Sequence, residues 1–296
     1  MRTPRVSVIV PTYHDWTRLA TCLAHLREQT CRTDEFEVIV VNNDPADPCP
    51  VADLGPNTVV INEAKPGSYA ARNRGVEHSN GEIVMFTDSD CVPDRSWVGE
   101  CLAGFDSNQR IQRLAGRVAL FTRHRKPNLA ESYELVYAFQ QERRALLLGA
   151  AATANMAARR CVFEKIGLFS EDMYSGGDIE WGVRASRRGI GITYRSSMVV
   201  GHPARVSLKQ LIEKRQRVTA GMSPSSIRRS CFASNGLVTA TVRDIVPPVR
   251  SINRGLRTPG LSVWTRVEAI AVMWSLRLYR AFYRLVLAVG LSRPRR

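Results

Sequence analysis

The chain has 296 residues, 44% of them hydrophobic, and a formal net charge of +15 at pH 7. This length suffices for a domain with a sizeable core, and the charge indicates an anionic partner such as nucleic acid, an acidic membrane surface or a phosphate-bearing substrate. The longest apolar stretch, Ala145 to Ala158, falls short of the roughly 20 residues of a membrane-spanning helix. Seven scattered cysteines without a C-x-x-C pair, and no signal sequence after Met1, predict a cytoplasmic protein with reduced thiols.

The first hundred residues alternate between strand and helix patterns. Runs of apolar and β-branched residues predict strands over 6–10, ended by Pro11, and over 36–41, 59–61 and 83–86. Helices are predicted from Asp15, and from Ser68, which can cap its helix, to about His78. This alternation is typical of a parallel sheet covered by helices, so we predict an α/β fold with a nucleotide-binding half over about 1–100. No G-x-G-x-x-G follows the first strand, which argues against a nicotinamide or flavin enzyme.

A pair of carboxylates follows the most strongly predicted strand. The run Ile83 to Phe86 is short and unbroken, as in strands buried on both faces, and Asp88-Ser89-Asp90 comes directly after it. Ligands bind at the carboxyl ends of the strands in open α/β sheets, and paired carboxylates are suitable ligands for Mg²⁺ or Mn²⁺. On its own, the same triplet is also typical of a plain turn at the end of a strand.

The second half of the chain is less regular. Residues 97–141 are predicted to be helical with a strand-like interruption over 114–122, and a further helix covers 164–169. Asp178 follows two glycines and can cap the basic helix that ends at Gly189. Short strands are predicted over 190–194 and 198–200, the second leading to His202.

Taken together, six motifs resemble those of the family 2 glycosyltransferases in order and approximate spacing. They are VSVIVPTYHD, EVIVVNN, ARNRGVEHSNGEIVMFTDSDCVP, ANMAARRCVFEKIGLFSED, GGDIEWGVRASRRG and VVGHPARVS, and they cover roughly Val6 to Gly221. The resemblance implies a GT-A catalytic domain over 1–225 with its acceptor half at about 101–225, followed by a helical, basic amphipathic extension over 226–296. The central sheet would be mostly parallel and flanked by helices.

The implied activity is inverting transfer of a sugar from a nucleoside-diphosphate sugar to a hydroxyl of a glycan or lipid-linked acceptor, as in polysaccharide biosynthesis. A non-catalytic nucleotide- or glycan-binding module on the same fold is the alternative. The basic residues are scattered through these motifs and form no recognisable nucleic-acid module, so no nucleic-acid partner is expected.

The resemblance also implies a metal and a base. Asp88 and Asp90 match the D-x-D motif that binds Mn²⁺ or Mg²⁺, and His202 matches a histidine that completes the site in several such enzymes. Asp178 matches the catalytic base, with Glu180 as the second candidate. The open alternatives are a structural role for His202 and a helix-capping role for Asp178.

On the donor side, Pro11, Tyr13, Arg72 and Ser89 fall in the matching motifs. Tyr13 would stack on the base, unless it is a core aromatic, and Arg72 would meet the diphosphate. The acceptor-side candidates are Asn155, which begins a matching motif, and Trp181, for which packing on its helix is the alternative.

This sequence departs from the family pattern at two places. The family usually carries aspartate at one or both positions occupied here by Asn42 and Asn43, with Asp44 able to substitute, so the nucleobase preference can differ. Gly177 stands where the family commonly has glutamate before the base.

The tail predicts one amphipathic helix over Val263 to Val289. Four arginines fall in one stripe: Arg266, Arg277, Arg280 and Arg284. A wide apolar face adjoins it: Val263, Val267, Ile270, Trp274, Leu278, Phe282 and Leu285. Two arrangements fit this pattern, namely peripheral attachment to an anionic membrane surface on its cytoplasmic face, and packing of the apolar face on the domain with the arginines in solvent.

Overall fold

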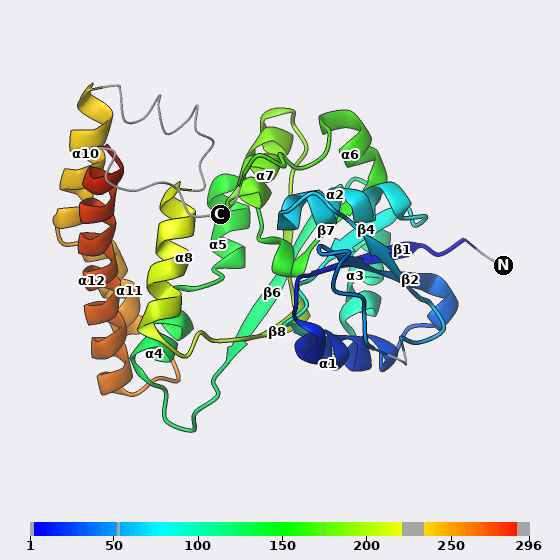
Figure 1. Ribbon diagram of the computed structural model, residues 1–296, viewed down its shortest axis with the longest axis horizontal. Helices are drawn as coiled ribbons and strands as arrows, with labels where there is room; N and C mark the ends of the chain where they lie inside the picture. The colour runs from blue at the N-terminus through cyan, green and yellow to red at the C-terminus, as the bar shows by residue number, and fades with distance from the viewer. Residues whose placement is uncertain (1–2, 52–53, 174, 221–233, 289–296) are drawn as a thin grey trace. The chain divides into compact units, whose positions relative to one another are not determined.

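The computed structural model describes residues 3–51, 54–173, 175–220 and 234–288 (Figure 1). They belong to two compact units. Unit 1 comprises Met1–Ala119, Phe139–Glu171 and Gly177–His202, and unit 2 comprises Leu120–Ala138, Asp172–Gly176 and Pro203–Arg296. The predicted boundary between residues 225 and 226 lies outside the described residues.

A mixed sheet forms the centre of unit 1. Among the described residues it has eight strands, in the order β3-β2-β1-β4-β7-β6-β8-β5. Their bounds are β1 Val6–Thr12, β2 Phe36–Asn42, β3 Thr58–Asn62, β4 Ile83–Phe86, β5 Val92–Pro93, β6 Arg113–Phe121, β7 Met156–Arg159 and β8 Thr193–Pro203.

The four N-terminal strands are parallel, as the alternating pattern predicts. Beyond β4 the sheet continues through antiparallel pairs, β4 with β7, β7 with β6, and β5 with β8. The α/β fold class is confirmed. The two strands predicted over 190–194 and 198–200 are one strand, β8, and the pattern did not predict β7.

Pro11 does not end the first strand, which continues to Thr12. β1 pairs with β4 only as far as Ile9 but with β2 as far as Thr12. The Ile9 carbonyl, which faces β4, accepts a hydrogen bond from the amide of Thr87. Backbone groups two residues apart on a strand face the same neighbour, so the nitrogen of Pro11 also faces this side, at a level where β4 has already ended. The missing N–H of proline therefore costs no ladder hydrogen bond.

Helices cover both faces of the parallel strands. In unit 1 their bounds are α1 Trp16–Arg27, α2 Ser68–His78, α3 Trp97–Ser107, α5 Gln141–Leu148, α6 Arg160–Ile166 and α7 Gly177–Arg187, with the short 3-10 helices η1 Thr33–Glu35 and η2 Thr153–Asn155. α1 and α3 pack against the even-numbered side chains of β1 in one core cluster, and α2 lies on the opposite face (Figure 1). Gly67 caps α2 at a φ of 132°, so Ser68 is its first residue and not its cap.

Unit 2 is helical. Its helices are α4 Leu129–Tyr137, α8 Leu208–Ala220, α10 Ser234–Ile245, α11 Val249–Arg257 and α12 Val263–Ala288. α12 confirms the predicted long helix within the described residues, since Val289 lies outside them. Its inner face packs with α4 and α8 through Ala130, Leu211, Val272 and Leu276.

The arginine stripe of α12 points into unit 2. Arg280 and Arg284 both bind Asp244 of α10, which is 0% exposed, and Arg277 donates to the carbonyl of Arg243. The expectation of solvated arginines is therefore wrong for this stripe, because a buried carboxylate and the last carbonyls of α10 accept its hydrogen bonds.

The outward face of α12 is apolar instead. Its exposed large side chains are Val263, Trp264, Val267, Trp274, Leu278, Phe282 and Leu285. At 100° per residue they span roughly 100° of the helix surface, and none of the arginines or Glu268 falls among them. Within the described ranges, no helix combines the length and hydrophobicity that a membrane crossing requires.

Candidate functional site

The candidate site lies where the parallel strands end. Asp88-Ser89-Asp90 follows β4, Tyr13 follows β1, and Asn42 is the last residue of β2. Because these strands are parallel, their carboxyl ends meet at one edge of the sheet. The register of β5 with β8, which pairs Val92 with Gly201, brings His202 to the same place.

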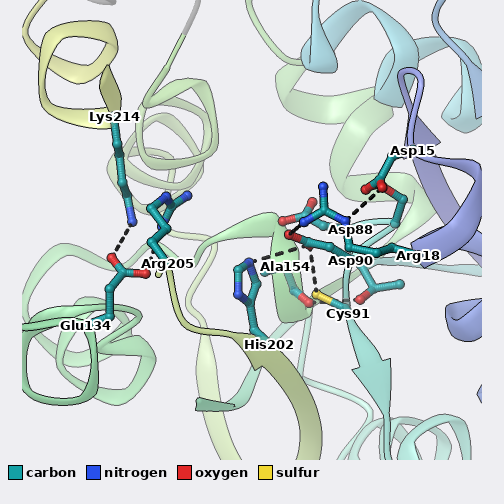
Figure 2. Close-up of polar contacts among 12 residues, drawn as sticks. Asp15, Arg18, Asp88, Asp90, Cys91, Glu134, Ala154, His202, Arg205 and Lys214 are labelled. Carbon is teal, nitrogen blue, oxygen red and sulfur yellow. Dashed lines mark hydrogen bonds and ion pairs between the residues drawn. The ribbon is translucent and has the colours of Figure 1, made fainter. Parts of the chain in front are cut away.

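Four side chains form a cluster that can hold a metal ion. One donor atom from each of Asp88, Asp90, Cys91 and His202 lies within 4.8 Å of the others. The Nε2 atom of His202 is 3.6 Å from Oδ1 of Asp90 (Figure 2). The structure thus brings together all three predicted metal ligands and adds Cys91.

The chemistry of this cluster suits a divalent cation. Two carboxylates and an imidazole are oxygen and nitrogen ligands of the kind that Mn²⁺ accepts. Burial raises the pKa of the Cys91 thiol well above its ordinary value, which disfavours the thiolate form that binds metals. Burial also raises the pKa of Asp90, against the opposing effect of His202.

Two residues near this cluster were missed by the sequence analysis. Nη1 of Arg18, on α1, lies 3.5 Å from Asp90, while its Nε donates to Asp15 at 2.8 Å. Asp15 also accepts a hydrogen bond from Oγ of Ser89 at 3.2 Å. The signal in the sequence was their place at the start of the helix that follows β1, a strand whose end lies at the site.

Arg72 binds the first carboxylate of the motif. Its Nη2 donates to Oδ1 of Asp88 at 2.5 Å, and its Nη1 donates to the carbonyl of Ser68. The guanidinium is 5.7 Å from the ring centroid of Tyr69, and the side chain is almost fully buried. A buried arginine beside Asp88 supplies fixed positive charge where an anionic ligand would bind.

The expected base-stacking residue is on the surface. Tyr13 is 63% exposed, which excludes the alternative of a core aromatic. The next residue, His14, adopts a φ of 53° and reaches Asp44 at 3.0 Å and Asp47 at 2.7 Å. This contact links the turn after β1 to the loop after β2.

The two asparagines that replace the expected aspartates bind their own loop. The buried amide of Asn42 donates to the carbonyls of Asp44 and Asp47. The Asn43 amide donates to the carbonyls of Glu63 and Lys65, and its oxygen accepts from the amide of Gly67. Their side chains therefore fix the loop backbone.

Asp178 lies in the first turn of α7 and is partly buried. Its Oδ1 accepts from the hydroxyl of Tyr69 at 3.2 Å and from the amide of Ile179 at 2.9 Å. Glu180, the second base candidate, is paired with Arg184 one turn along at 2.9 Å. Of the two carboxylates, Asp178 is thus the one without a cationic partner among the described residues.

Both acceptor-side candidates are interior residues, which for Trp181 is the packing alternative. Asn155 is fully buried, where it accepts from Nε1 of Trp97 and donates to two backbone carbonyls. Trp181 is also fully buried, stacks on Phe163 at 4.6 Å between centroids, and donates to the carbonyl of Gly167. Both side chains are therefore engaged in packing and hydrogen bonding within unit 1.

Comparison with known proteins assigns the family. The model of "Glycosyl transferase family 2" matches residues 7–167. The glycosyltransferase AglE of Haloferax volcanii is 30% identical over 289 residues, covering 93% of both chains. The pre-mycofactocin glycosyltransferase of Mycobacterium tuberculosis is 26% identical over 236 residues, covering 75% of this chain and 48% of its own.

Two solved structures share the fold. The mannosyltransferase PcManGT of Pyrobaculum calidifontis, in complex with GDP-Man and Mn²⁺, gives a TM-score of 0.58 at 19% identity, covering 99% of this chain and 77% of its own. Residues 1–349 of TarS from S. aureus, in complex with UDP-GlcNAc, give 0.55 at 17% identity, covering 92% of this chain and 90% of theirs. The chain therefore belongs to glycosyl transferase family 2 and is a glycosyltransferase built on the GT-A fold.

Proposed function

We propose that this glycosyltransferase moves a sugar from a nucleoside-diphosphate sugar to a hydroxyl acceptor with inversion, and that Asp178 is its general base. One observation carries the proposal. Two residues one turn apart on α2 contact the two parts of the site, Arg72 through Asp88 and Tyr69 through Asp178. A single rigid helix thus connects the metal-suited cluster with a carboxylate that has no cationic partner among the described residues.

The donor would bind at the strand ends. Asp88, Asp90 and His202 would hold Mn²⁺ or Mg²⁺, which stabilises negative charge on the departing diphosphate. Tyr13 would stack on the nucleobase through its exposed ring. Since Asn42 and Asn43 hold the loop backbone, the following carboxylate, Asp44, is the candidate for reading the edge of the base. The relatives support this class of donor, because one was solved with GDP-Man and Mn²⁺ and another with UDP-GlcNAc.

The transfer would be a single displacement. The acceptor oxygen forms a bond to the anomeric carbon while the bond from that carbon to the diphosphate oxygen breaks, and its electron pair leaves with the nucleoside diphosphate. The hydroxyl proton passes to the carboxylate of Asp178. Because the nucleophile enters opposite the leaving group, one displacement inverts the configuration. The acceptor class proposed is a glycan or lipid-linked hydroxyl, as in polysaccharide biosynthesis.

Two measurements test this function. A thermal-shift screen of nucleoside diphosphates with and without Mn²⁺ should raise the melting temperature only for the preferred base, and more strongly with the metal. Asp178→Asn should retain that shift and lose transfer, whereas Glu180→Gln, which alters the carboxylate paired with Arg184, should keep most of the activity. Unchanged transfer by Asp178→Asn would refute the assignment of the base.

We also propose that unit 2 attaches the enzyme to an anionic membrane surface through the outward face of α12. That face is free of charged residues and carries Trp264, which is 76% exposed. Tryptophan side chains are favoured at membrane interfaces, and an uncharged face along a helix can lie in the interface plane. The exposed arginines of the neighbouring helices, among them Arg243 and Arg250, and the net charge of +15 complement anionic lipid.

Sedimentation with vesicles tests this attachment. The double variant Trp264→Ser/Phe282→Ser should lose binding to vesicles that contain phosphatidylglycerol. Leu147→Ser, which removes an exposed leucine of α5 in unit 1, is the matched control and should bind as wild type. Binding that persists in the double variant, or that fails in the control to the same degree, would overturn the proposal.

A further inference from the structure

We infer that Tyr69 is a positioning residue for the general base, and that Gly177 is the residue that lets it reach the base. This inference deepens the proposed function and rests on Asp178 being the base. The Tyr69 hydroxyl donates to Oδ1 of Asp178 at 3.2 Å from a different helix, 109 residues away in the sequence. Tyr69 would act only through this contact with Asp178 and would not itself touch the substrate.

The ring of Tyr69 is held in place on several sides. Tyr69 is buried, with 6% of its surface exposed. The ring packs against Phe169, with centroids 5.8 Å apart, and the guanidinium of Arg72 lies 5.7 Å from its centroid. Burial, and to a lesser degree the nearby Asp178, raise the pKa of Tyr69, so the hydroxyl keeps its proton and acts as a donor.

Gly177 makes room for this ring. A Cβ atom at residue 177 would lie 2.8, 2.9 and 3.0 Å from three ring carbons of Tyr69, a separation that real Cβ contacts do not sustain. The ring cannot withdraw freely, because Phe169 lies against it. The two residues therefore form one arrangement in which any side chain at 177 would push the hydroxyl away from Asp178.

The hydrogen bonds to Asp178 select one of its two oxygens. Oδ1 accepts both from Tyr69 and from the amide of Ile179, at 3.2 and 2.9 Å. Among the described residues, Oδ2 has no donor, so it is the oxygen that remains to take the acceptor's proton. Two charged residues of the same two helices have other partners, since Arg72 binds Asp88 and Glu180 is paired with Arg184. Tyr69 thus fixes the rotation of the carboxylate and presents Oδ2.

Tyr69→Phe in the full-length enzyme tests the inference, since it keeps the ring and removes the donor. We expect kcat to fall roughly 10- to 100-fold, as for loss of a hydrogen bond to a charged group, with the KM for the donor changed by less than about twofold. Tyr279→Phe, which removes a hydroxyl bonded to Gln216 in unit 2, is the matched control and should leave both kcat and KM unchanged.

A second variant tests the inference independently, in case Tyr69→Phe does not fold. Gly177→Ala keeps the hydroxyl but displaces the ring, and should lower kcat in the same direction. In the double variant the loss should be smaller than the product of the two single losses, because both remove one hydrogen bond. Each variant should still show the thermal shift with nucleoside diphosphate and Mn²⁺.

The outcomes separate the inference from the proposed function. If Asp178→Asn abolishes transfer while Tyr69→Phe keeps wild-type kcat, the positioning role is refuted and the base assignment stands. If Asp178→Asn transfers sugar normally, the base assignment itself fails. Equal losses in Tyr69→Phe and Tyr279→Phe would also refute a specific role for Tyr69.

Discussion

Replacing Asp244 with asparagine should loosen the contact between α10 and α12. The carboxylate is fully buried and receives ion pairs from Arg280 and Arg284. Removing one member of a buried ion pair typically costs about 3–5 kcal/mol, because the partner charge stays behind. Both arginines keep about a fifth of their side-chain surface in water, so we expect the lower end, about 3 kcal/mol.

Hydrogen exchange measures this loss where it occurs. A cost of about 3 kcal/mol corresponds to roughly a 100-fold increase in local opening, since each 1.4 kcal/mol is about tenfold. Amides of α10 and of the C-terminal half of α12 should exchange faster by that factor in Asp244→Asn.

The matched control is Asp106→Asn, which removes an exposed carboxylate paired with Arg5 at 2.6 Å. Exposed pairs contribute at most about 1 kcal/mol, so exchange near residue 106 should rise by about fivefold or less. Acceleration of less than about threefold in α10 and α12 of Asp244→Asn would refute the view that the buried carboxylate holds the arginine stripe.

Three further outcomes are expected. Asn155→Ala should lower the free energy of unfolding in urea by about 2–4 kcal/mol, because Trp97 and two buried carbonyls lose their partner, and the KM for acceptor should not change. Asp90→Asn should weaken Mn²⁺ binding, followed by electron paramagnetic resonance, at least about tenfold. Burial alone would raise the pKa of Glu134, but Lys214 and Arg205 lower it below its ordinary value. The stability from this lowered pKa is present above the unfolded pKa, about 4.3, and is lost as the pH falls towards the folded pKa. The urea midpoint should therefore fall less steeply below pH 4.5 in Glu134→Gln than in wild type.

The sheet edge could be predicted because its signals are local. The unbroken run of β4 and the carboxylates that follow it are adjacent in the sequence, and parallel strands bring their ends together. Tyr13 and Arg72 were instead assigned from the resemblance of their motifs to the family; Tyr13 directly follows β1, and Arg72 binds Asp88. Position in a motif does not state whether a side chain faces the ligand or the core, and Asn155 and Trp181 are both buried.

Other parts of the site depend on contacts between distant residues. No local pattern connects Tyr69 with Asp178, or Arg18 with Asp90. For α12, helical periodicity identified the basic stripe and the apolar face but not which of them is buried. The arrangement depends on contacts with other helices: Val272 and Leu276 pack against α4 and α8, and Asp244 of α10 binds Arg280 and Arg284.

Pro11 has a consequence for its neighbour as well as for its own strand. The backbone groups of Ile9 face β4, and the next residue of β1 whose backbone groups face the same side is Pro11, which has no N–H. A continuation of β4 would therefore find no N–H donor at this position of β1. Asp88 lies outside the sheet, where its carboxylate binds Arg72, and Pro11, which was expected to contact the donor, marks the level at which the pairing of β1 with β4 has ended.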